Sequence, residues 1–328
     1  MKVVFFFRKK LPQFHSIEGV FNGVIHELGK VAQAERVEVP YEGAGPRSII
    51  GNLSFTHKHK GGINHITGHV NYLAMVTGRK TVLTVHDIGS AFYGNALHRF
   101  LIKTFWFWIP ALLVKRITVI SEFTRQELYA LIPFAKHKIR VVHNPVSPEI
   151  KEKAKIFNSS IPLILLIGTK TNKNLERTLE ALQGIPCSLL ILGQLTEPQL
   201  KLLAAYNLEY ENKFAIPYSE VLTSYKKCDL LCFASTYEGF GMPIIEAQAV
   251  GRPVLTSNLG VMPEVAGKGA CFVDPLDVRS IREGVLKIIN NETCREELVT
   301  KGLENVKRFR VEKIAEDYLA VYKEVLEE

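Results

Sequence analysis

Cysteine is scarce in this sequence, and the few cysteines lie apart from one another. None lies in the first half and no two form a Cys-x-x-Cys pair: they are Cys187, Cys228, Cys232, Cys271 and Cys294. An odd number without paired spacing argues against a disulfide framework or a zinc ribbon, so we expect a reducing, cytoplasmic location. The apolar stretch after Met1 is too short for the core of a signal peptide. No uncharged apolar run of about 18 residues is present, so we expect no membrane-spanning helix.

Several motifs for metal and cofactor chemistry are also missing. There is no Asp-x-Asp, and the nearest pattern is Asp274 with Asp277. No complete G-x-G-x-x-G follows an early strand and no G-x-x-x-x-G-K-[ST] occurs, which argues against a nicotinamide enzyme and a P-loop NTPase. His57, His59 and His65 are near one another, but without acidic companions they predict a polar loop. We therefore expect no bound metal and no cofactor.

Negative charge is lacking in the first half only. The net charge is +8 over 328 residues, but residues 1–150 hold 19 Lys and Arg against 9 Asp and Glu, and residues 151–328 hold 22 against 24. All ten histidines also precede residue 150. The overall basic balance would suit nucleic acid, but no recognised binding motif supports that partner, so none is expected.

Short apolar runs alternate with amphipathic stretches along the chain. Strands are predicted at 2–7, 36–39, 81–86, 117–120, 139–143, 162–168, 187–192, 229–234, 252–256 and 270–273. Runs of Val, Ile, Leu and Phe without alternation are typical of parallel strands buried on both faces. Because this βαβ rhythm occurs twice, we expect an α/β protein with two domains, 1–150 and 151–310. The amphipathic segment 311–328 predicts a terminal helix that packs on another part of the chain.

The segment 230–266 reads as a strand, a glycine-punctuated loop, a helix and another strand. Ligands of open parallel sheets lie beyond the carboxyl ends of strands, where a helix N-terminus favours anions. Glu238 lies on the loop and Glu246 lies eight residues further on, so they can touch different parts of one extended ligand. The loop predicted to contact that ligand consists of Glu238, Gly239, Phe240, Gly241 and Met242.

This segment resembles a known signature. TYEGFGMPIIEAQAVGRPV (236–254), followed by MPEV (262–265) and VDP (273–275), is similar to the Glu-x7-Glu region of the retaining glycosyltransferases of family 4. The resemblance implies a GT-B fold, in which two Rossmann-like domains face an interdomain cleft. The second domain would bind a nucleotide-diphosphate sugar and the first would take the acceptor. The alternative is an ordinary strand–turn–helix with two surface glutamates.

The resemblance adds residues on the donor side. Gly168 would end a strand, and Lys170 and Lys173 would hold the donor diphosphate, unless they are simply solvated lysines. Asn174 would cap the helix that starts at Leu175. Pro217 would contact the base.

On the acceptor side, NHITGHVNYLA (64–74) is similar to family members that act on bacterial surface polysaccharides, which implies roles for Thr67, Gly68 and His69. His86 and Asp87 follow a strand, and His86 would bond a sugar hydroxyl or the acceptor, or make only a structural hydrogen bond. Gly19 stands where family members have a glycine-rich first loop near the phosphate.

The segment 98–116 is apolar and aromatic with basic ends, and two interpretations stay open. One is a core helix interrupted by Pro110. The other is a membrane-surface element with Trp106, Phe107 and Trp108 at the headgroups and Arg99, Lys103, Lys115 and Arg116 near anionic lipid.

The resemblance therefore implies a retaining, metal-independent hexosyltransferase of surface-polysaccharide or lipopolysaccharide synthesis, with Glu238, His86 and Lys173 in catalysis. Its partners would be a nucleotide-sugar donor and a glycan or lipid-linked glycan acceptor. Its location would be the cytoplasm or the inner face of the cell membrane. The alternatives are an epimerase or hydrolase of the same fold and a non-catalytic nucleotide-sugar-binding subunit.

Overall fold

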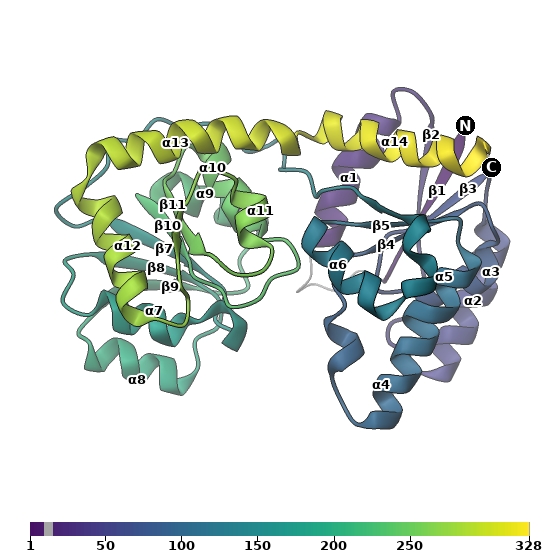
Figure 1. Ribbon diagram of the computed structural model, residues 1–328, viewed down its shortest axis with the longest axis horizontal. Helices are drawn as coiled ribbons and strands as arrows, with labels where there is room; N and C mark the ends of the chain where they lie inside the picture. The colour runs from purple at the N-terminus through teal and green to yellow at the C-terminus, as the bar shows by residue number, and fades with distance from the viewer. Residues whose placement is uncertain (10–15, 328) are drawn as a thin grey trace. The chain divides into compact units, whose positions relative to one another are not determined.

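The computed structural model describes residues 1–9 and 16–327, which fall into two compact units (Figure 1). The first unit comprises Met1–Ser147 with Arg310–Glu328, and the second comprises Pro148–Phe309. The chain thus leaves the first unit after Ser147, a few residues before the predicted boundary at 150. The C-terminal segment belongs to the first unit.

Six parallel strands form the sheet of the first unit in the order β2-β1-β3-β4-β5-β6. Their bounds are β1 (Lys2–Phe7), β2 (Gln33–Glu38), β3 (Ile63–Ile66), β4 (Thr81–Val85), β5 (Arg116–Val119) and β6 (Ile139–Val141). Five of them were predicted. β3 was missed because its sequence, INHI, contains two polar residues, although all four side chains are buried.

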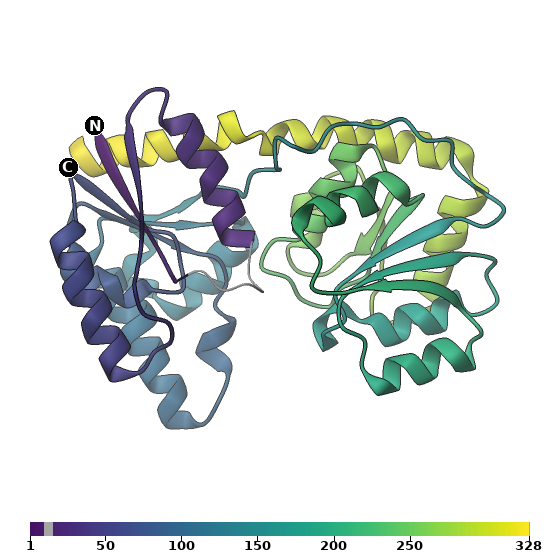
Figure 2. The same cartoon turned by 180° about the vertical axis from the view of Figure 1, so that it is seen from behind.

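The strand β1 shows why its apolar run does not alternate. Val3, Phe5 and Phe7 pack into one core cluster, while Val4 and Phe6 pack into another on the opposite face of the sheet. Helices cover both faces of the sheet and so exclude water from it (Figures 1 and 2). They are α1 (Ser16–Leu28), α2 (Pro46–His59), α3 (Ala74–Thr77), α4 (Ala96–Ile102), α5 (Ile109–Leu113), α6 (Glu122–Leu131) and α14 (Val311–Glu327).

The terminal helix α14 packs beside α1 and against the sheet (Figure 2). Its buried residues recur at helical spacing: Val311, Ile314, Ala315, Tyr318, Val321, Tyr322 and Val325. Glu324 accepts hydrogen bonds from Arg116 (2.7 Å) and Arg140 (3.2 Å), which holds the end of the helix against β5 and β6.

The second unit also contains six parallel strands, in the order β12-β11-β10-β7-β8-β9. Their bounds are β7 (Leu163–Ile167), β8 (Ser188–Leu192), β9 (Glu209–Lys213), β10 (Leu230–Phe233), β11 (Val254–Ser257) and β12 (Cys271–Val273). Only β9 was missed, because it is an edge strand with the polar sequence EYENK and a mostly exposed surface.

The helices of the second unit connect these strands. They are α7 (Leu175–Leu182), α8 (Glu197–Ala205), α9 (Tyr218–Lys227), α10 (Met242–Val250), α11 (Met262–Ala266), α12 (Val278–Asn290) and α13 (Glu292–Val306). Across residues 1–9 and 16–327, no helix combines the length and the apolar character needed to cross a membrane.

The strand order defines a switch point in each sheet. In the second unit the chain runs from β7 to β8 and β9 on one side, and then returns to β10 on the other side of β7. In the first unit the corresponding point lies between β1 and β3. Ligands of open α/β sheets bind at such points, beyond the carboxyl ends of the strands.

Candidate functional site

The switch point of the second unit brings two predicted site residues into direct contact. The loop after β7 carries Lys173 and the loop after β10 carries Glu238, 65 residues further along the chain. Lys173 Nζ donates to Glu238 Oε1 at 2.7 Å, and the two side chains are 20% and 13% exposed. The Lys173 ammonium also lies 4.8 Å from the centre of the Phe233 ring. The pair therefore forms a partly buried charged site at the carboxyl edge of the sheet.

Gly168, at the end of β7, makes this position of Lys173 available. Its φ is +90°, which favours glycine, and a Cβ atom there would lie 2.7 Å from Lys173 Cγ and 2.8 Å from Cε. The missing side chain thus leaves the space through which the lysine stem passes. This close approach explains why a glycine stands at the strand end.

The sequence suggested that Asn174 caps α7. Asn174 does occupy the N-cap position, but its side chain makes no capping hydrogen bond. Its own φ is +57°, and its side-chain amide donates instead to the carbonyl oxygens of Ala234 (3.1 Å) and Pro275 (2.6 Å). The buried amide therefore joins the loops after β7, β10 and β12. This position holds Lys173 beside the β10 loop.

In the predicted ligand loop, only one of the two glycines adopts the left-handed conformation. Gly241 has φ +99° and immediately precedes α10, which starts at Met242, whereas Gly239 is not in that region. Phe240 is buried and packs edge-to-face on Phe309, with ring centres 5.7 Å apart. Its side chain therefore belongs to the core, and only its backbone remains for a ligand.

Glu246 is buried on α10, and its carboxylate accepts hydrogen bonds from two tyrosine hydroxyls. Tyr218 donates to Oε1 and Tyr225 donates to Oε2, each at 2.7 Å. Burial raises the pKa of Glu246, and the two hydrogen bonds oppose that shift. Each carboxylate oxygen accepts one bond from tyrosine and keeps capacity for another donor. Sequence reasoning missed both tyrosines, although their spacing of seven residues on α9 places them on one face.

Lys170 and Pro217 lie at the exposed border of the same region. Lys170 is exposed, and its side chain has no hydrogen bond or ion pair among the described residues. Pro217 is exposed directly before α9. The structure thus joins Lys173 and Glu238, adds the tyrosine pair around Glu246, and leaves Lys170 exposed at the border.

A second group of predicted residues gathers at the carboxyl ends of β3 and β4. Thr67 is buried and its hydroxyl donates to Phe6 O at 3.0 Å, so its side chain is structural. Gly68 has φ +118°, and a Cβ atom there would lie 2.6 Å from the His86 ring. His69 has φ +62° and its ring lies parallel to that of His86, with centres 6.3 Å apart.

His86 makes the structural hydrogen bond considered above, and keeps one nitrogen for other partners. Its Nε2 lies 2.7 Å from Thr67 O, and a carbonyl only accepts, so Nε2 carries the proton and Nδ1 is an acceptor in the neutral ring. Burial lowers the pKa of His86 from 6.5 to about 4, against the opposing effect of the Thr67 bond. The ring is therefore neutral at physiological pH. Asp87 follows it and accepts the Gly89 N–H at 2.9 Å.

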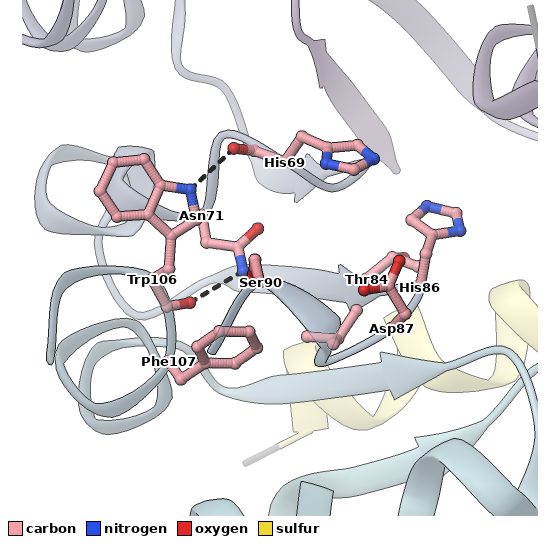
Figure 3. A pocket seen from close by; sticks show the side chains of 9 residues that line it. His69, Asn71, Thr84, His86, Asp87, Ser90, Trp106 and Phe107 are labelled. Atoms are coloured by element: carbon pink, nitrogen blue, oxygen red, sulfur yellow. Dashed lines mark hydrogen bonds between the residues drawn. The ribbon is translucent and has the colours of Figure 1, made fainter. Parts of the chain in front are cut away.

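His86 and Asp87 line a cavity of about 60 Å³ together with residues that sequence reasoning missed (Figure 3). The additional lining includes Asn71, Ser90, Trp106 and Phe107. These residues come from three segments, 71–73, 89–92 and 103–108, whose proximity no local pattern in the sequence indicates.

Two other predictions for the first unit were wrong. Gly19 lies within the helix α1 on its exposed side, not in a loop, because the apolar side chains of Val20, Phe21 and Val24 face the core. The predicted loop covers residues 14–29, of which 14 and 15 lie outside the described residues. His57, His59 and His65 do not form a polar loop: the first two end α2, and His65 is fully buried in β3.

The segment 98–116 packs in part into the core, and Pro110 does not interrupt it, because the helical turns of Lys103–Trp108 continue into α5. Its contact with membrane stays a prediction. Phe107 is buried, and the indole N–H groups of Trp106 and Trp108 donate to His69 O (2.9 Å) and Leu131 O (3.0 Å). These aromatic side chains are anchored in the unit, with both tryptophans packed against its core. Arg116 is likewise buried and bonded to Glu324. Exposed apolar side chains lie on both sides of the two tryptophans in the chain: Phe92, Tyr93, Leu97, Phe100, Leu101 and Phe105 precede them, and Leu112 and Leu113 follow them.

No set of three His, Cys, Asp or Glu side chains within the described ranges converges as metal ligands would. Metal independence of the reaction stays a prediction.

Solved structures identify the class of fold. A glycosyltransferase from Rickettsia africae superposes with a TM-score of 0.77 over 99% of this chain and 98% of its own, at 18% identity. An Anabaena protein, HepE, solved in complex with UDP and glucose, superposes with a TM-score of 0.76 over 98% and 99%, at 12% identity. Two Rossmann-like units with parallel sheets, shared with these proteins, confirm the predicted GT-B fold class.

Sequence comparisons identify the family. The model "Glycosyl transferases group 1" matches residues 147–305, and "Glycosyltransferase Family 4" matches residues 59–150. The O-antigen chain mannosyltransferase B of Escherichia coli is 27% identical over 237 residues. The match covers 64% of this chain and 60% of that relative's length. The chain belongs to family 4 of the glycosyltransferases, and the predicted family is confirmed.

Proposed function

We propose that the protein is a retaining hexosyltransferase that moves a sugar from a nucleotide-diphosphate sugar to a glycan or lipid-linked glycan in surface-polysaccharide synthesis. The observation that carries this proposal is the 2.7 Å contact of Lys173 with Glu238 at the switch point of the second sheet. A cation and a carboxylate at this point are suited to the two halves of such a donor. The cation suits the diphosphate and the carboxylate suits the sugar hydroxyls.

Different residues of the site bind different parts of the donor. Lys173, with Lys170 and the N-terminus of α10, stabilises charge that develops on the leaving diphosphate. Glu238 and the backbone of 239–242 orient the sugar. Glu246, held by its two tyrosines, accepts hydrogen bonds from the ribose.

The reaction is then a displacement on the face that the diphosphate leaves. The acceptor oxygen forms a bond to the anomeric carbon as the bond from that carbon to the diphosphate oxygen breaks. The leaving phosphate oxygen takes the proton of the acceptor hydroxyl. His86 accepts a hydrogen bond through Nδ1 from the sugar or the acceptor, and no metal is needed.

The named relatives suggest where to look for the donor. One relative named above is an O-antigen mannosyltransferase, and one structural neighbour was solved with UDP and glucose. We therefore propose a hexose donor, with GDP-mannose and UDP-glucose as the first compounds to test. Differential scanning fluorimetry across UDP-, GDP- and dTDP-sugars should show one nucleotide that raises the melting temperature, because a ligand of the folded state stabilises it.

A variant tests the catalytic assignment. Glu238→Gln should reduce transfer by about a hundredfold or more while the nucleotide still binds, because the lost carboxylate orients the sugar. Glu297→Gln is the matched control, since this glutamate is 61% exposed on α13 and pairs with Lys301. Near-normal transfer by Glu238→Gln would refute the assignment. EDTA should leave wild-type transfer unchanged.

The same assay separates the alternatives. An epimerase or hydrolase would release free nucleotide or an epimer without an acceptor. A non-catalytic subunit would bind donor and transfer to no glycan. Retention is read from the anomeric configuration of the product, and an inverted product would refute that part of the proposal.

We also propose a peripheral contact with anionic membrane through the α4 surface, which we define as Phe92, Tyr93, Leu97, Phe100, Leu101 and Phe105. All six side chains are exposed, and Arg99 and Lys103 lie among them on the chain. Apolar side chains interspersed with cations are typical of elements that lie on anionic lipid.

The test is co-sedimentation with vesicles. Phosphatidylglycerol vesicles should bind the protein, and pure phosphatidylcholine vesicles should bind it much less. A Leu97→Ser, Phe100→Ser variant should lose binding, whereas Leu200→Ser, at an exposed leucine of the second unit, should keep it. Equal binding to uncharged vesicles would contradict the electrostatic part of this proposal.

A further inference from the structure

The cavity beside His86 contains a buried acceptor without a partner. Asn71 is only 5% exposed, and its Oδ1 has no hydrogen bond among the described residues. Its Nδ2 donates to Trp106 O at 2.8 Å. Since a carbonyl oxygen only accepts, this bond fixes which way the amide faces, and Oδ1 points into the cavity (Figure 3). A buried acceptor left unpaired costs free energy, so a donor is expected at this position.

The neighbouring helical segment holds this amide in place. Residues Lys103–Trp108 form a π-helical turn, a geometry that is frequent at functional sites. Pro110 has no N–H to give to the Trp106 carbonyl four residues earlier, and the Asn71 amide donates to that carbonyl. In return the Trp106 indole donates to His69 O at 2.9 Å. The two bonds tie the loop after β3 to the π-helical turn.

The cavity offers several acceptors and no cation. Asn71 Oδ1 and the Asp87 carboxylate accept only, and Ser90 adds a hydroxyl that can donate or accept. The described residues that line the cavity include no lysine or arginine. Arg8 is nearby, but its guanidinium is paired with the buried Glu18 at 3.1 Å. An anion would therefore be repelled, whereas a group that donates hydrogen bonds would be held.

We propose that this cavity binds a neutral hexose unit, with one sugar hydroxyl donating to Asn71 Oδ1 and another to Asp87. Its place in the reaction, as the subsite for the terminal sugar of the acceptor, rests on the proposed function. The binding of a hexose does not. Asn71 is then a residue that determines acceptor specificity, because it requires a hydroxyl at one position of the ring.

The chain provides its own reporter for this cavity. It contains two tryptophans, and one of them, Trp106, lines the cavity. We would titrate the full-length protein with the methyl α-glycosides of mannose, glucose and galactose and follow tryptophan fluorescence. At least one glycoside should shift the emission with saturation, and inorganic phosphate should neither shift it nor compete. No response to any of the three, or competition by phosphate, would overturn the proposal.

Asn71→Leu should weaken the glycoside by about tenfold, since it removes one hydrogen bond to a buried group. Asn22→Leu, at an exposed asparagine on α1, is the matched control and should bind like the wild type. Unchanged binding by Asn71→Leu would overturn the role of this residue.

A second measurement does not depend on the folding of the variant. On wild-type protein, the monodeoxy analogues of the best glycoside should include one that binds about tenfold more weakly, because its missing hydroxyl leaves Asn71 Oδ1 unpaired. Uniform affinity across the series would overturn the proposal. Donor binding is measured separately by thermal shift, so a failure of the proposed function is distinguishable: hexose would still bind while no nucleotide sugar does.

Discussion

Acid should destabilise the first unit through a single buried histidine. His65 is fully buried in β3, with Nδ1 2.6 Å from the Tyr322 hydroxyl and Nε2 2.7 Å from the Thr84 hydroxyl. The rings of Phe5 and Phe21 lie 5.0 Å and 5.1 Å from its own. Burial, with a smaller effect of the neighbouring His86, lowers the pKa of His65 from 6.5 to about 3.

The sign and size of the effect follow from that shift. Because the folded-state pKa lies below the unfolded value, the unfolded chain binds more protons between the two values. Stability is therefore fully present above pH 6.5 and is lost as the pH falls toward 3. At about pH 5 the loss from His65 is about 2 kcal/mol, and it grows by about 1.4 kcal/mol per further pH unit.

Urea unfolding followed by tryptophan fluorescence measures this loss. Both tryptophans, Trp106 and Trp108, lie in the first unit, so the signal reports on that unit. The free energy of unfolding of the wild type should fall more steeply between about pH 8 and pH 5 than that of His65→Gln, by about 2 kcal/mol.

His137→Gln is the matched control, because this histidine is exposed, and it should follow the wild type. His86 is present in all three proteins, so its own contribution is common to them. The same pH dependence in the wild type and in His65→Gln would refute the reasoning, whatever the stability of the variant at neutral pH.

Three further predictions concern the proposed site. Gly168→Ala should lower transfer about tenfold or more, because the added methyl group displaces Lys173. Gly184→Ala is the control: Gly184 has φ +71° and open space around it, so this variant should show only the cost of the backbone conformation. Equal transfer by both variants would contradict this account. Tyr225→Phe should reduce the unfolding free energy of the second unit, measured by circular dichroism, by about 1.5–3 kcal/mol, because a bond to the Glu246 carboxylate is lost; no loss would mean that the bond contributes nothing. The acid limb of the pH–rate profile due to His86 should lie near its pKa of about 4, and an inflection near 6.5 that disappears in His86→Gln would contradict its burial.

Much of the fold could be predicted because buried parallel strands leave a local pattern. The ten apolar runs became strands, since each needs only about five residues of Val, Ile, Leu or Phe to be recognised. β3 and β9 escaped prediction for opposite reasons. β3 buries Asn64 and His65, whose polar atoms find partners far along the chain, and β9 is an exposed edge that buries little.

The candidate site divides in the same way. Glu238 and Glu246 stand in one motif whose order along the chain is itself informative, and Lys173 follows an earlier predicted strand. Contacts between distant segments are not in the motif: Tyr225 reaches Glu246 from another helix, and in the first unit Asn71 meets Trp106 across 35 residues. Phe240, inside the motif, proved to be a core residue, because its ring packs on Phe309.

The sequence by itself determined the βαβ rhythm, the division into two units, the amphipathic terminal helix and the loop-helix motif at 236–254. Each of these depends on the geometry of a few consecutive residues, so a local pattern suffices. Only the tertiary structure decided that β7 lies next to β10, which is why Lys173 meets Glu238. It also decided that His65 is buried under α14 and that Asn71 faces a cavity. Such contacts depend on strand order and on packing between distant segments, which reflect the free energy of the whole unit and leave no local period to read.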